Sequence, residues 1–290
     1  MDTMTRPAQP GRCQTKHPII LLHGIGYRDD MFLLASWGRI PDALRAEGAE
    51  VYLGGLDAWN SHENSAAKLK PKVEAVLQET GAGKVNLIAH SKGGLEARYL
   101  IAKLGMGAQV ASLTTVCTPH QGSLVADVVT GLIPDRSGLL RFNLLRWLGQ
   151  KLGFKALDFL ARLTGDHSPQ ARLALDGLTR PSMERFNREV VDDPGVYYQS
   201  YGTLMRGPAD DPVFAATYSL LLLEQQGDND GVVPVASCQW GNFRGLIAQS
   251  DPGTGLSHAD LVDYRGSLVQ GIDIPQVYVG MVDDLRQRGF

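Results

Sequence analysis

The stretch Val85-Asn86-Leu87-Ile88-Ala89-His90-Ser91-Lys92-Gly93-Gly94 decides the fold that we expect of this chain. It reads as a short apolar run, then a serine in a sharp turn, then a helical segment over residues 95–104. This order places one hydroxyl group at the tip of a strained turn, beside the N-terminus of a helix. The usual pattern is Gly-x-Ser-x-Gly; here the small Ala89 replaces the first glycine, and the two later glycines keep side chains away from a crowded turn. Ser91 is therefore a candidate nucleophile.

Apolar runs and helical stripes alternate on both sides of this stretch. The continuous apolar run over 18–22 is typical of a strand buried on both faces of a parallel sheet. Shorter or less continuous apolar segments predict further strands over 51–53, 85–90, 111–116 and 196–201. Apolar residues at helical spacing predict helices over 37–47, 64–80, 95–104 and 277–286. Pro71 either kinks the second helix or begins it. The alternation favours an α/β fold with a mostly parallel central sheet flanked by helices.

The middle of the chain has a different pattern. Apolar residues are dense from Val125 to Leu163, with basic residues between them, which predicts a lid-like helical insertion over about 123–180. Two roles fit this pattern equally: a packing pair of helices, or a lid with an apolar underside above a pocket. We expect one domain over residues 17–290, after a polar, flexible N-terminal tail over residues 1–16.

The composition argues against several classes of protein. The chain has 290 residues, of which 43% are hydrophobic, and its net charge of −3 comes without a basic block, so nucleic acid is not an expected partner. No apolar run approaches the ~18 residues that a membrane helix needs, so no transmembrane segment is expected. The N-terminus lacks the apolar core of a signal peptide, which predicts a cytoplasmic location as written, or a secreted one if a leader has been removed.

Three cysteines are too few and too scattered for a disulfide framework or a zinc site. We expect Cys13, Cys117 and Cys238 to be buried free thiols. A single bridge from Cys238 to one of the other two is the alternative.

A serine hydroxyl becomes a nucleophile when an imidazole takes its proton and a carboxylate orients that imidazole. After Ser91 the chain offers the acidic cluster Asp228-Asn229-Asp230-Gly231 and then His258. Serine, acid and histidine in this order are the arrangement of the α/β-hydrolase fold. Each of the other histidines precedes the acid, and His90 flanks the serine on the wrong side of the turn. His258 is the expected base. Asp228 and Asp230 are both candidates for the acid.

The negative charge that develops on an acyl oxygen needs preorganised donors. In this fold one is the backbone N–H of the residue after the nucleophile, here Lys92, and the other comes from an early strand-end loop. The loop His23-Gly24-Ile25-Gly26 directly follows the first apolar run. Its two glycines let the backbone turn inward, which makes the Ile25 amide the expected second donor.

With these segments the chain resembles the bacterial triacylglycerol lipase family of the α/β-hydrolase superfamily, that is, the Pseudomonas/Burkholderia-type lipases and their clostridial relatives. The matching segments begin at residues 18, 84, 118, 229 and 257: Pro-Ile-Ile-Leu-Leu-His-Gly-Ile, Lys-Val-Asn-Leu-Ile-Ala-His-Ser-Lys-Gly-Gly, Thr-Pro-His-Gln-Gly-Ser, Asn-Asp-Gly-Val-Val and Ser-His-Ala-Asp. The resemblance implies that Ser91 is the nucleophile, Asp230 the acid and His258 the base. It assigns the oxyanion hole to Ile25 and Lys92. Asp228 remains the alternative acid.

The resemblance also implies a structural Ca²⁺ beside the histidine loop, bound by two aspartates and two carbonyl oxygens. Asp211 and Asp260 match the aspartates, but the amide expected six residues after the histidine falls on Tyr264. The cysteines do not match the disulfide positions of the family, and no cofactor is needed for the chemistry. Some relatives bind zinc in an insertion after the third strand; here Asp57-Ala58-Trp59-Asn60-Ser61-His62 lacks the second histidine, which favours a surface loop or pocket rim.

The sequence therefore predicts a serine carboxylester hydrolase, a lipase or a lipase-like esterase that forms an acyl-enzyme on Ser91. The expected partner is an acyl ester or lipid, with the helical insertion in contact with a lipid–water interface. A short-chain carboxylesterase, a thioesterase or an acyltransferase on the same fold is the alternative. A more remote one is an inactive lipid-binding module.

Overall fold

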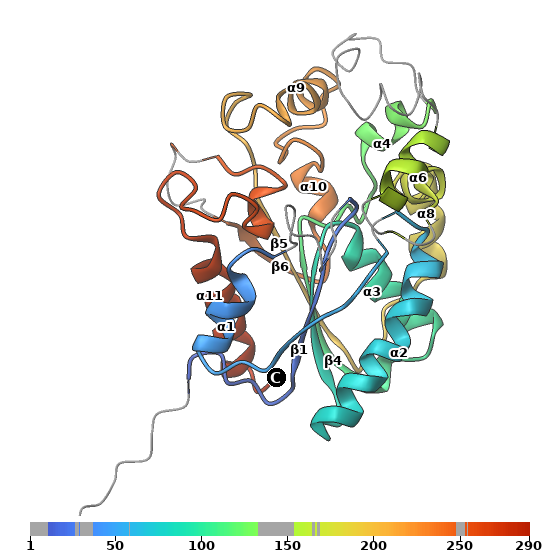
Figure 1. Ribbon diagram of the computed structural model, residues 1–290. Coiled ribbons are helices and arrows are strands. Elements are labelled where there is room, and N and C mark those ends of the chain that lie inside the picture. Colours follow the sequence, from blue (N-terminus) through green and yellow to red (C-terminus); the bar gives the residue numbers. More distant parts are fainter. Residues whose placement is uncertain are drawn as a thin grey trace, which may run out of the picture.

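A six-stranded parallel sheet lies at the centre of the molecule, with the strand order β2-β1-β3-β4-β5-β6 (Figure 1). The strands are β1 (Ile19–Leu22), β2 (Val51–Leu53), β3 (Val85–His90), β4 (Val110–Val116), β5 (Tyr197–Gly202) and β6 (Asn242–Leu246). The structure is a computed structural model that describes residues 11–26, 29, 37–57, 59–132, 154–163, 166, 169–247, 253 and 255–290. The predicted α/β fold with a parallel sheet is confirmed.

Helices cover both faces of this sheet because side chains alternate between the faces along each strand. Ile19 and Leu21 of β1 join the cluster under α1 (Ile40–Ala46) and α11 (Ile274–Gln287), whereas Ile20 and Leu22 join the cluster under α2 (His62–Thr80) and α3 (Lys92–Lys103). Figure 1 shows these two pairs of helices on opposite sides of the sheet. The apolar runs of the sequence are therefore strands buried on both faces.

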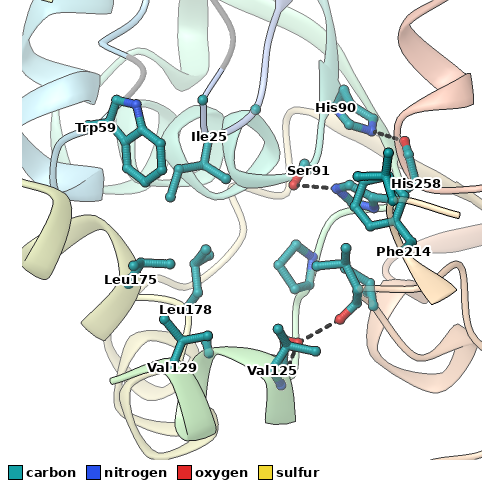
Figure 2. Close-up of a pocket in the computed structure, with 18 residues that line it drawn as sticks. Ile25, Trp59, His90, Ser91, Val125, Val129, Leu175, Leu178, Phe214 and His258 are labelled. Carbon is teal, nitrogen blue, oxygen red and sulfur yellow. Dashed lines mark hydrogen bonds between the residues drawn. The ribbon is translucent and has the colours of Figure 1, made fainter. Parts of the chain in front are cut away.

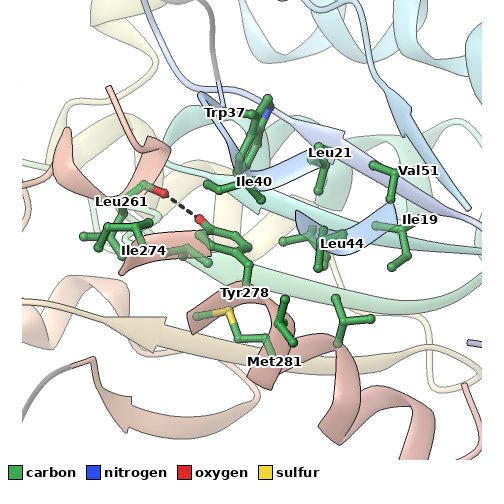
Figure 3. Close-up of a cluster of buried hydrophobic side chains, with 14 of the residues drawn as sticks. Ile19, Leu21, Trp37, Ile40, Leu44, Val51, Leu261, Ile274, Tyr278 and Met281 are labelled. Atoms are coloured by element: carbon green, nitrogen blue, oxygen red, sulfur yellow. Dashed lines mark hydrogen bonds between the residues drawn. The ribbon is translucent and has the colours of Figure 1, made fainter. Parts of the chain in front are cut away.

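One of these clusters connects the core to the segment that carries the predicted base. Figure 3 shows Tyr278 of α11 packed beside Trp37, with ring centroids 5.7 Å apart. The Tyr278 hydroxyl donates a hydrogen bond of 2.8 Å to the backbone oxygen of Leu261, in the short helix η4 (Asp260–Val262). The last helix of the chain therefore anchors the loop that follows His258.

Several elements differ from the prediction, which contained no helix over Ala215–Leu223 or Val235–Cys238. Helix α2 begins at His62 and continues through Pro71 to Thr80, so the proline does not begin it. The edge strand β6 was not predicted, because most of its side chains are exposed or half-buried and it lacks an apolar run. An edge strand needs to bury less surface than a central one, so its sequence signal is weaker.

A layer of helices lies beyond the carboxyl ends of the strands (Figure 1). Its helices are α4 (Leu124–Val129), α6 (Phe154–Leu163), α7 (Ala171–Asp176), α8 (Arg180–Glu189), α9 (Ala215–Leu223) and α10 (Val235–Cys238). Helices α4, α6 and α7 belong to the stretch predicted as an insertion, and α8 begins where that stretch ends. The predicted leucine stripe over residues 145–152 lies outside the described residues.

The end of the predicted N-terminal tail packs against the body of the protein. The Cys13 side chain is fully buried, and the Lys16 amide donates a hydrogen bond of 2.8 Å to the backbone oxygen of Phe290. A short 3₁₀ helix, η1 (Gly107–Gln109), precedes β4. Within the described part of the chain, we find no helix with the length and apolar character to span a membrane.

Candidate active site

Ser91 lies in a strained turn between β3 and α3. Its backbone has φ 54° and ψ −130°, a conformation that residues other than glycine rarely adopt. Two hydrogen bonds hold this turn against the next strand: the Ser91 amide donates to Val116 O at 2.9 Å, and the Thr118 hydroxyl donates to Ser91 O at 2.7 Å. The predicted turn between strand and helix is confirmed.

Glycines surround the serine because neighbouring backbones approach it closely. A β-carbon on Gly93 would lie 2.6 Å from His23 O, and one on Gly94 would collide with the Thr118 side chain. On the other side, a β-carbon on Gly24 would lie 2.7 Å from the β-carbon of Ser91. The loop after β1 can therefore lie directly against the serine only if these positions have no side chain.

His258 and Asp230 complete a chain of hydrogen bonds that begins at Ser91. Figure 2 shows the first of these bonds, between Ser91 and His258. His258 Nε2 lies 2.9 Å from Ser91 Oγ, and His258 Nδ1 lies 2.7 Å from Asp230 Oδ2. All three residues are at most 6% exposed. Nδ1 faces a carboxylate and therefore carries the hydrogen, which leaves Nε2 free to accept the serine proton.

The backbone around Asp230 explains why this aspartate, and not Asp228, meets the histidine. Asp230 Oδ1 accepts hydrogen bonds from the amides of Val232 and Val233 at 2.9 and 2.7 Å, which leaves Oδ2 for His258. The His258 amide also donates to Asp230 O at 2.9 Å. Asp228 is exposed. The structure therefore brings together Ser91, Asp230 and His258 from three distant segments.

The two predicted oxyanion donors belong to segments that meet at the serine. Lys92 is the first residue of α3, and N–H groups in the first turn have no partner within the helix. Ile25 follows β1 and lines the cavity beside Ser91 (Figure 2). The buried His23 holds this loop in place, because its ring nitrogens lie 2.9 Å from Gly24 O and 3.1 Å from Leu56 O.

The Lys92 side chain is not part of the cavity wall. Its ammonium group forms a buried ion pair with Glu96 one turn along α3, and Nζ lies 3.4 Å from Ser65 Oγ on α2. Burial raises the pKa of the Glu96 carboxyl group. The side chain of Lys92 therefore joins α3 to α2, while its amide remains available beside the serine.

A cavity of about 440 Å³ opens above Ser91 and His258. Its walls are almost entirely apolar and come from the loop after β1, from α4 and α7, and from the segments that follow them. Figure 2 shows the apolar side chains that face it, which include Ile25, Trp59, Val125, Val129, Leu175, Leu178 and Phe214. Sequence reasoning did not find these positions one by one, since the segments that carry them are far apart in the chain.

His90 was set aside in the sequence, yet it is buried beside His258 and lines the same cavity. Burial lowers the pKa of His90 well below its ordinary value, and the neighbouring His258 lowers it further. His90 is therefore neutral at physiological pH. Its position directly before the serine could have indicated that it is buried beside the site, because the last residue of a central strand is buried.

Asp211 and Asp260 lie beside the histidine loop, as the resemblance implied, but hydrogen-bond donors surround them. Arg265 Nε donates to Asp260 Oδ1 at 2.7 Å, and the Tyr264 hydroxyl donates to Asp211 Oδ2 at 3.1 Å. A Ca²⁺ ion needs six to eight oxygen atoms that accept, and a guanidinium group offers none. The residues at this place do not fit the ion.

The other candidate metal ligands are also engaged. Asp57 pairs with Lys68 at 2.5 Å, and His62 Nε2 lies 3.2 Å from Gly177 O. Among the described residues, one group of potential ligand side chains comes together, and it consists of Cys117 and the pair Asp230 and His258. Burial raises the pKa of Cys117 well above its ordinary value, so this thiol is protonated and a poor ligand. All three cysteines are free and buried, as predicted.

The chain is similar to several known lipases and esterases. The family model described as palmitoyl protein thioesterase matches residues 18–151. A triacylglycerol lipase of Vibrio cholerae is 38% identical over 182 residues, which are 62% of this chain and 56% of that protein. A triacylglycerol lipase of Pseudomonas fragi is 28% identical over 302 residues and covers 95% of this chain and 98% of its own length. A solved lipase of Bacillus licheniformis, in its mature form, matches with a TM-score of 0.66 at 19% identity, over 95% of this chain and 94% of that one. The chain therefore spans little more than half of the Vibrio protein.

Proposed function

Since this chain is an α/β-hydrolase related to the bacterial triacylglycerol lipases, we propose that it is a serine carboxylester hydrolase that cleaves acyl esters. One observation carries the proposal: a serine, a histidine and an aspartate, joined by hydrogen bonds of 2.9 and 2.7 Å, lie at the floor of an apolar cavity.

The proposed reaction begins when Ser91 Oγ attacks the ester carbonyl carbon and His258 Nε2 takes the serine proton. Asp230 keeps the imidazole in the required tautomer and stabilises the imidazolium ion that forms. The amides of Lys92 and Ile25 donate to the developing oxyanion, and one such donor typically contributes about 3–4 kcal/mol to the transition state. His258 then protonates the leaving alcohol, and a water molecule activated by the same histidine releases the fatty acid from the acyl-enzyme.

The cavity suits the acyl part of the substrate. Its walls offer apolar contacts, and each buried methylene group contributes about 0.8 kcal/mol. Binding energy from the chain then orients the ester carbonyl between the serine and the two amides. We further propose that the helical layer above the sheet brings this opening to a lipid–water interface, where long-chain esters are concentrated.

The test is a hydrolysis profile over p-nitrophenyl esters from C2 to C16, repeated with a triglyceride emulsion. Ser91→Ala removes the nucleophile and lowers turnover by about 10⁴-fold or more, while the melting temperature stays near that of the wild type. The matched control is Ser182→Ala, on α8 and outside the cavity, which keeps full turnover. Undiminished turnover by the Ser91 variant would rule out the proposal. Activity on the emulsion and on long chains identifies a lipase, and a maximum at short chains without emulsion activity identifies an esterase.

A second candidate function is thioester hydrolysis, which the match to the palmitoyl protein thioesterase model favours. The same serine and amides would act on a thioester carbonyl, and a thiol would leave in place of the alcohol. The two functions separate in a direct comparison of kcat/KM for palmitoyl-CoA and for p-nitrophenyl palmitate. A preference for the thioester that disappears in Ser91→Ala supports the second function.

A further inference from the structure

The side chain of Arg265 lies between the two aspartates that the resemblance assigns to calcium. Its Nε donates to Asp260 Oδ1 at 2.7 Å, and its Nη2 lies 3.3 Å from Asp211 Oδ2. The same Nη2 donates to the backbone oxygen of Asp210 at 3.3 Å. One guanidinium group therefore contacts two carboxylates and a backbone carbonyl, which is the kind of oxygen set that would otherwise hold a divalent cation.

The remaining contacts of these carboxylates also come from hydrogen-bond donors. Asp211 Oδ2 accepts from the Ser257 hydroxyl at 2.7 Å and from the Tyr264 hydroxyl at 3.1 Å, and its Oδ1 accepts from the Val213 amide at 3.0 Å. Asp260 Oδ2 accepts from the Ser257 amide at 2.8 Å. Each of the four carboxylate oxygens therefore has a donor. These donors satisfy the hydrogen-bonding capacity of both carboxylates. A calcium site would instead surround the ion with oxygen atoms that accept.

The charges require a cation at this place. Asp211 and Asp260 are 1% and 0% exposed, and two buried carboxylates near each other repel unless a positive charge lies between them. The Arg265 side chain is one-third exposed, so it reaches the pair from the surface and keeps part of its hydration. The guanidinium group also lies over the Tyr264 ring, 5.2 Å from its centroid.

This cluster is connected directly to the candidate base. Ser257 donates its hydroxyl to Asp211 and its amide to Asp260, and the next residue is His258. The aspartate pair therefore holds the His258 backbone on one side. On the other side, the His258 amide donates a hydrogen bond to Asp230 O. If the aspartates separate, Ser257 loses two hydrogen bonds and the imidazole is no longer held at 2.9 Å from the serine.

We propose that Arg265 is a built-in cation: it takes the place of calcium, holds Asp211 and Asp260 against Ser257, and so positions His258. The positioning role of Arg265 rests on the proposed function. The claim that the folded protein does not need calcium is independent of that function. Lysine cannot reproduce the planar fork that reaches both carboxylates, although it supplies the charge. The protein is accordingly stable and active without added metal.

The first experiment uses the wild-type protein treated with excess EDTA and then with millimolar Ca²⁺. The melting temperature is expected to be the same in both solutions, and so is kcat. A melting temperature that falls with EDTA and returns with Ca²⁺ overturns the proposal. The melting temperature can be measured without activity, so this readout stands apart from any failure of the proposed function.

The second experiment compares Arg265→Gln, Arg265→Lys and the control Arg188→Gln, which removes an exposed arginine paired with Glu184 on α8. Arg265→Gln is expected to lower the melting temperature and to lower kcat about tenfold or more with little change in KM, since a charge-assisted contact that aligns the base is lost. Arg265→Lys recovers part of both, and Arg188→Gln changes neither. Assays run well below the melting temperature of each variant. Wild-type values for Arg265→Gln, or a lower melting temperature with unchanged kcat, overturn the positioning role.

A third variant, Arg265→Ala, frees the oxygen atoms that the arginine now occupies. Millimolar Ca²⁺ is expected to raise its melting temperature, and Mg²⁺, which requires a smaller octahedral site, is expected to raise it less. A variant that is destabilised and that neither cation stabilises contradicts the claim that arginine has taken the place of a cation site.

Discussion

His90 and His258 lie side by side at the floor of the cavity, with ring centroids 4.6 Å apart and His90 Nε2 3.0 Å from the backbone oxygen of His258 (Figure 2). A carbonyl oxygen only accepts, so Nε2 of His90 carries the hydrogen of this bond. His90, directly before the candidate nucleophile, thus supports the backbone of the candidate base, while its neutral ring places no charge beside the imidazolium ion of the proposed reaction.

His90→Phe keeps an aromatic ring in this position and removes the donor. Loss of the hydrogen bond leaves the His258 carbonyl unsatisfied and loosens the base, which is expected to lower kcat about tenfold while KM changes little. Steady-state kinetics on a p-nitrophenyl ester measure this. As a control, His17→Phe alters a histidine before β1, away from the cavity, and leaves kcat unchanged. A His90 variant with wild-type kcat would show that the contact is only packing.

Asp230→Asn tests the choice between the two aspartates of one cluster. The amide group can still accept the bonds from Val232 and Val233, but it favours the wrong tautomer of His258, so kcat is expected to fall about 10³- to 10⁴-fold. Asp228→Asn, two residues away and exposed, is the matched control and keeps full activity. The reverse pattern would assign the acid to Asp228.

Two leucines on α7 test the role of the cavity as an acyl site. Leu175 is buried and lines the cavity, whereas Leu173 is 45% exposed on the same helix. Leu175→Trp fills part of the space and is expected to lower kcat/KM for C12–C16 esters roughly tenfold relative to the C4 ester, because the long chain loses its place. Leu173→Trp leaves the profile unchanged. Equal losses for all chain lengths would place the acyl chain elsewhere.

Buried neutral histidines make the stability of this protein dependent on pH. Burial lowers the pKa of His62 to about 4 and the pKa values of His90 and His120 well below their ordinary value of 6.5. Between those values and 6.5 the unfolded chain binds more protons than the folded one, so unfolding becomes easier as the pH falls. Each of the three histidines then costs about 1.4 kcal/mol per pH unit in this window.

We therefore expect the free energy of unfolding in urea to decrease as the pH falls from 7 to 5. His62→Asn, which cannot take up a proton, is expected to show a shallower slope than the wild type over this range. A slope that does not change in this variant would mean that His62 is protonated in the folded protein.

The ion pair between Lys92 and Glu96 allows a test of how much free energy the burial of two opposite charges costs. Both side chains are 1% exposed, so Glu96→Gln leaves a buried ammonium group without its partner charge and is expected to destabilise the protein by about 3–5 kcal/mol. The double variant Lys92→Met with Glu96→Leu removes both charges and is expected to be much closer to the wild type. Urea unfolding of the three proteins provides the comparison. A double variant as unstable as the single one would show that the pair itself stabilises α2 against α3.

The sequence by itself determined the inner strands of the sheet and the candidate nucleophile. Ile19–Leu22 is apolar without interruption and Val85–His90 is mostly apolar, because a central parallel strand is buried on both faces, and this signal is local. The turn at Ser91 could also be predicted, since its glycines are required where His23 O and Thr118 approach it. Strand β6 escaped prediction because an edge strand buries little.

Only the tertiary structure decided which polar groups meet. The spacing along the chain favoured His258 but could not choose between Asp228 and Asp230; the amides of Val232 and Val233 made that choice by holding one carboxylate toward the histidine. The cavity walls likewise come from segments that only the fold brings together.

The place assigned to calcium shows the same limit most clearly. Asp211 and Asp260 match a metal site by position in the sequence, but a position does not reveal which cation lies between two carboxylates. Arg265 reaches both aspartates only because the fold brings Asp211 beside the segment that follows η4. Tertiary packing decides the chemistry that depends on short distances between segments far apart in the chain. Burial and turn geometry depend on neighbouring residues and can therefore be predicted from the sequence.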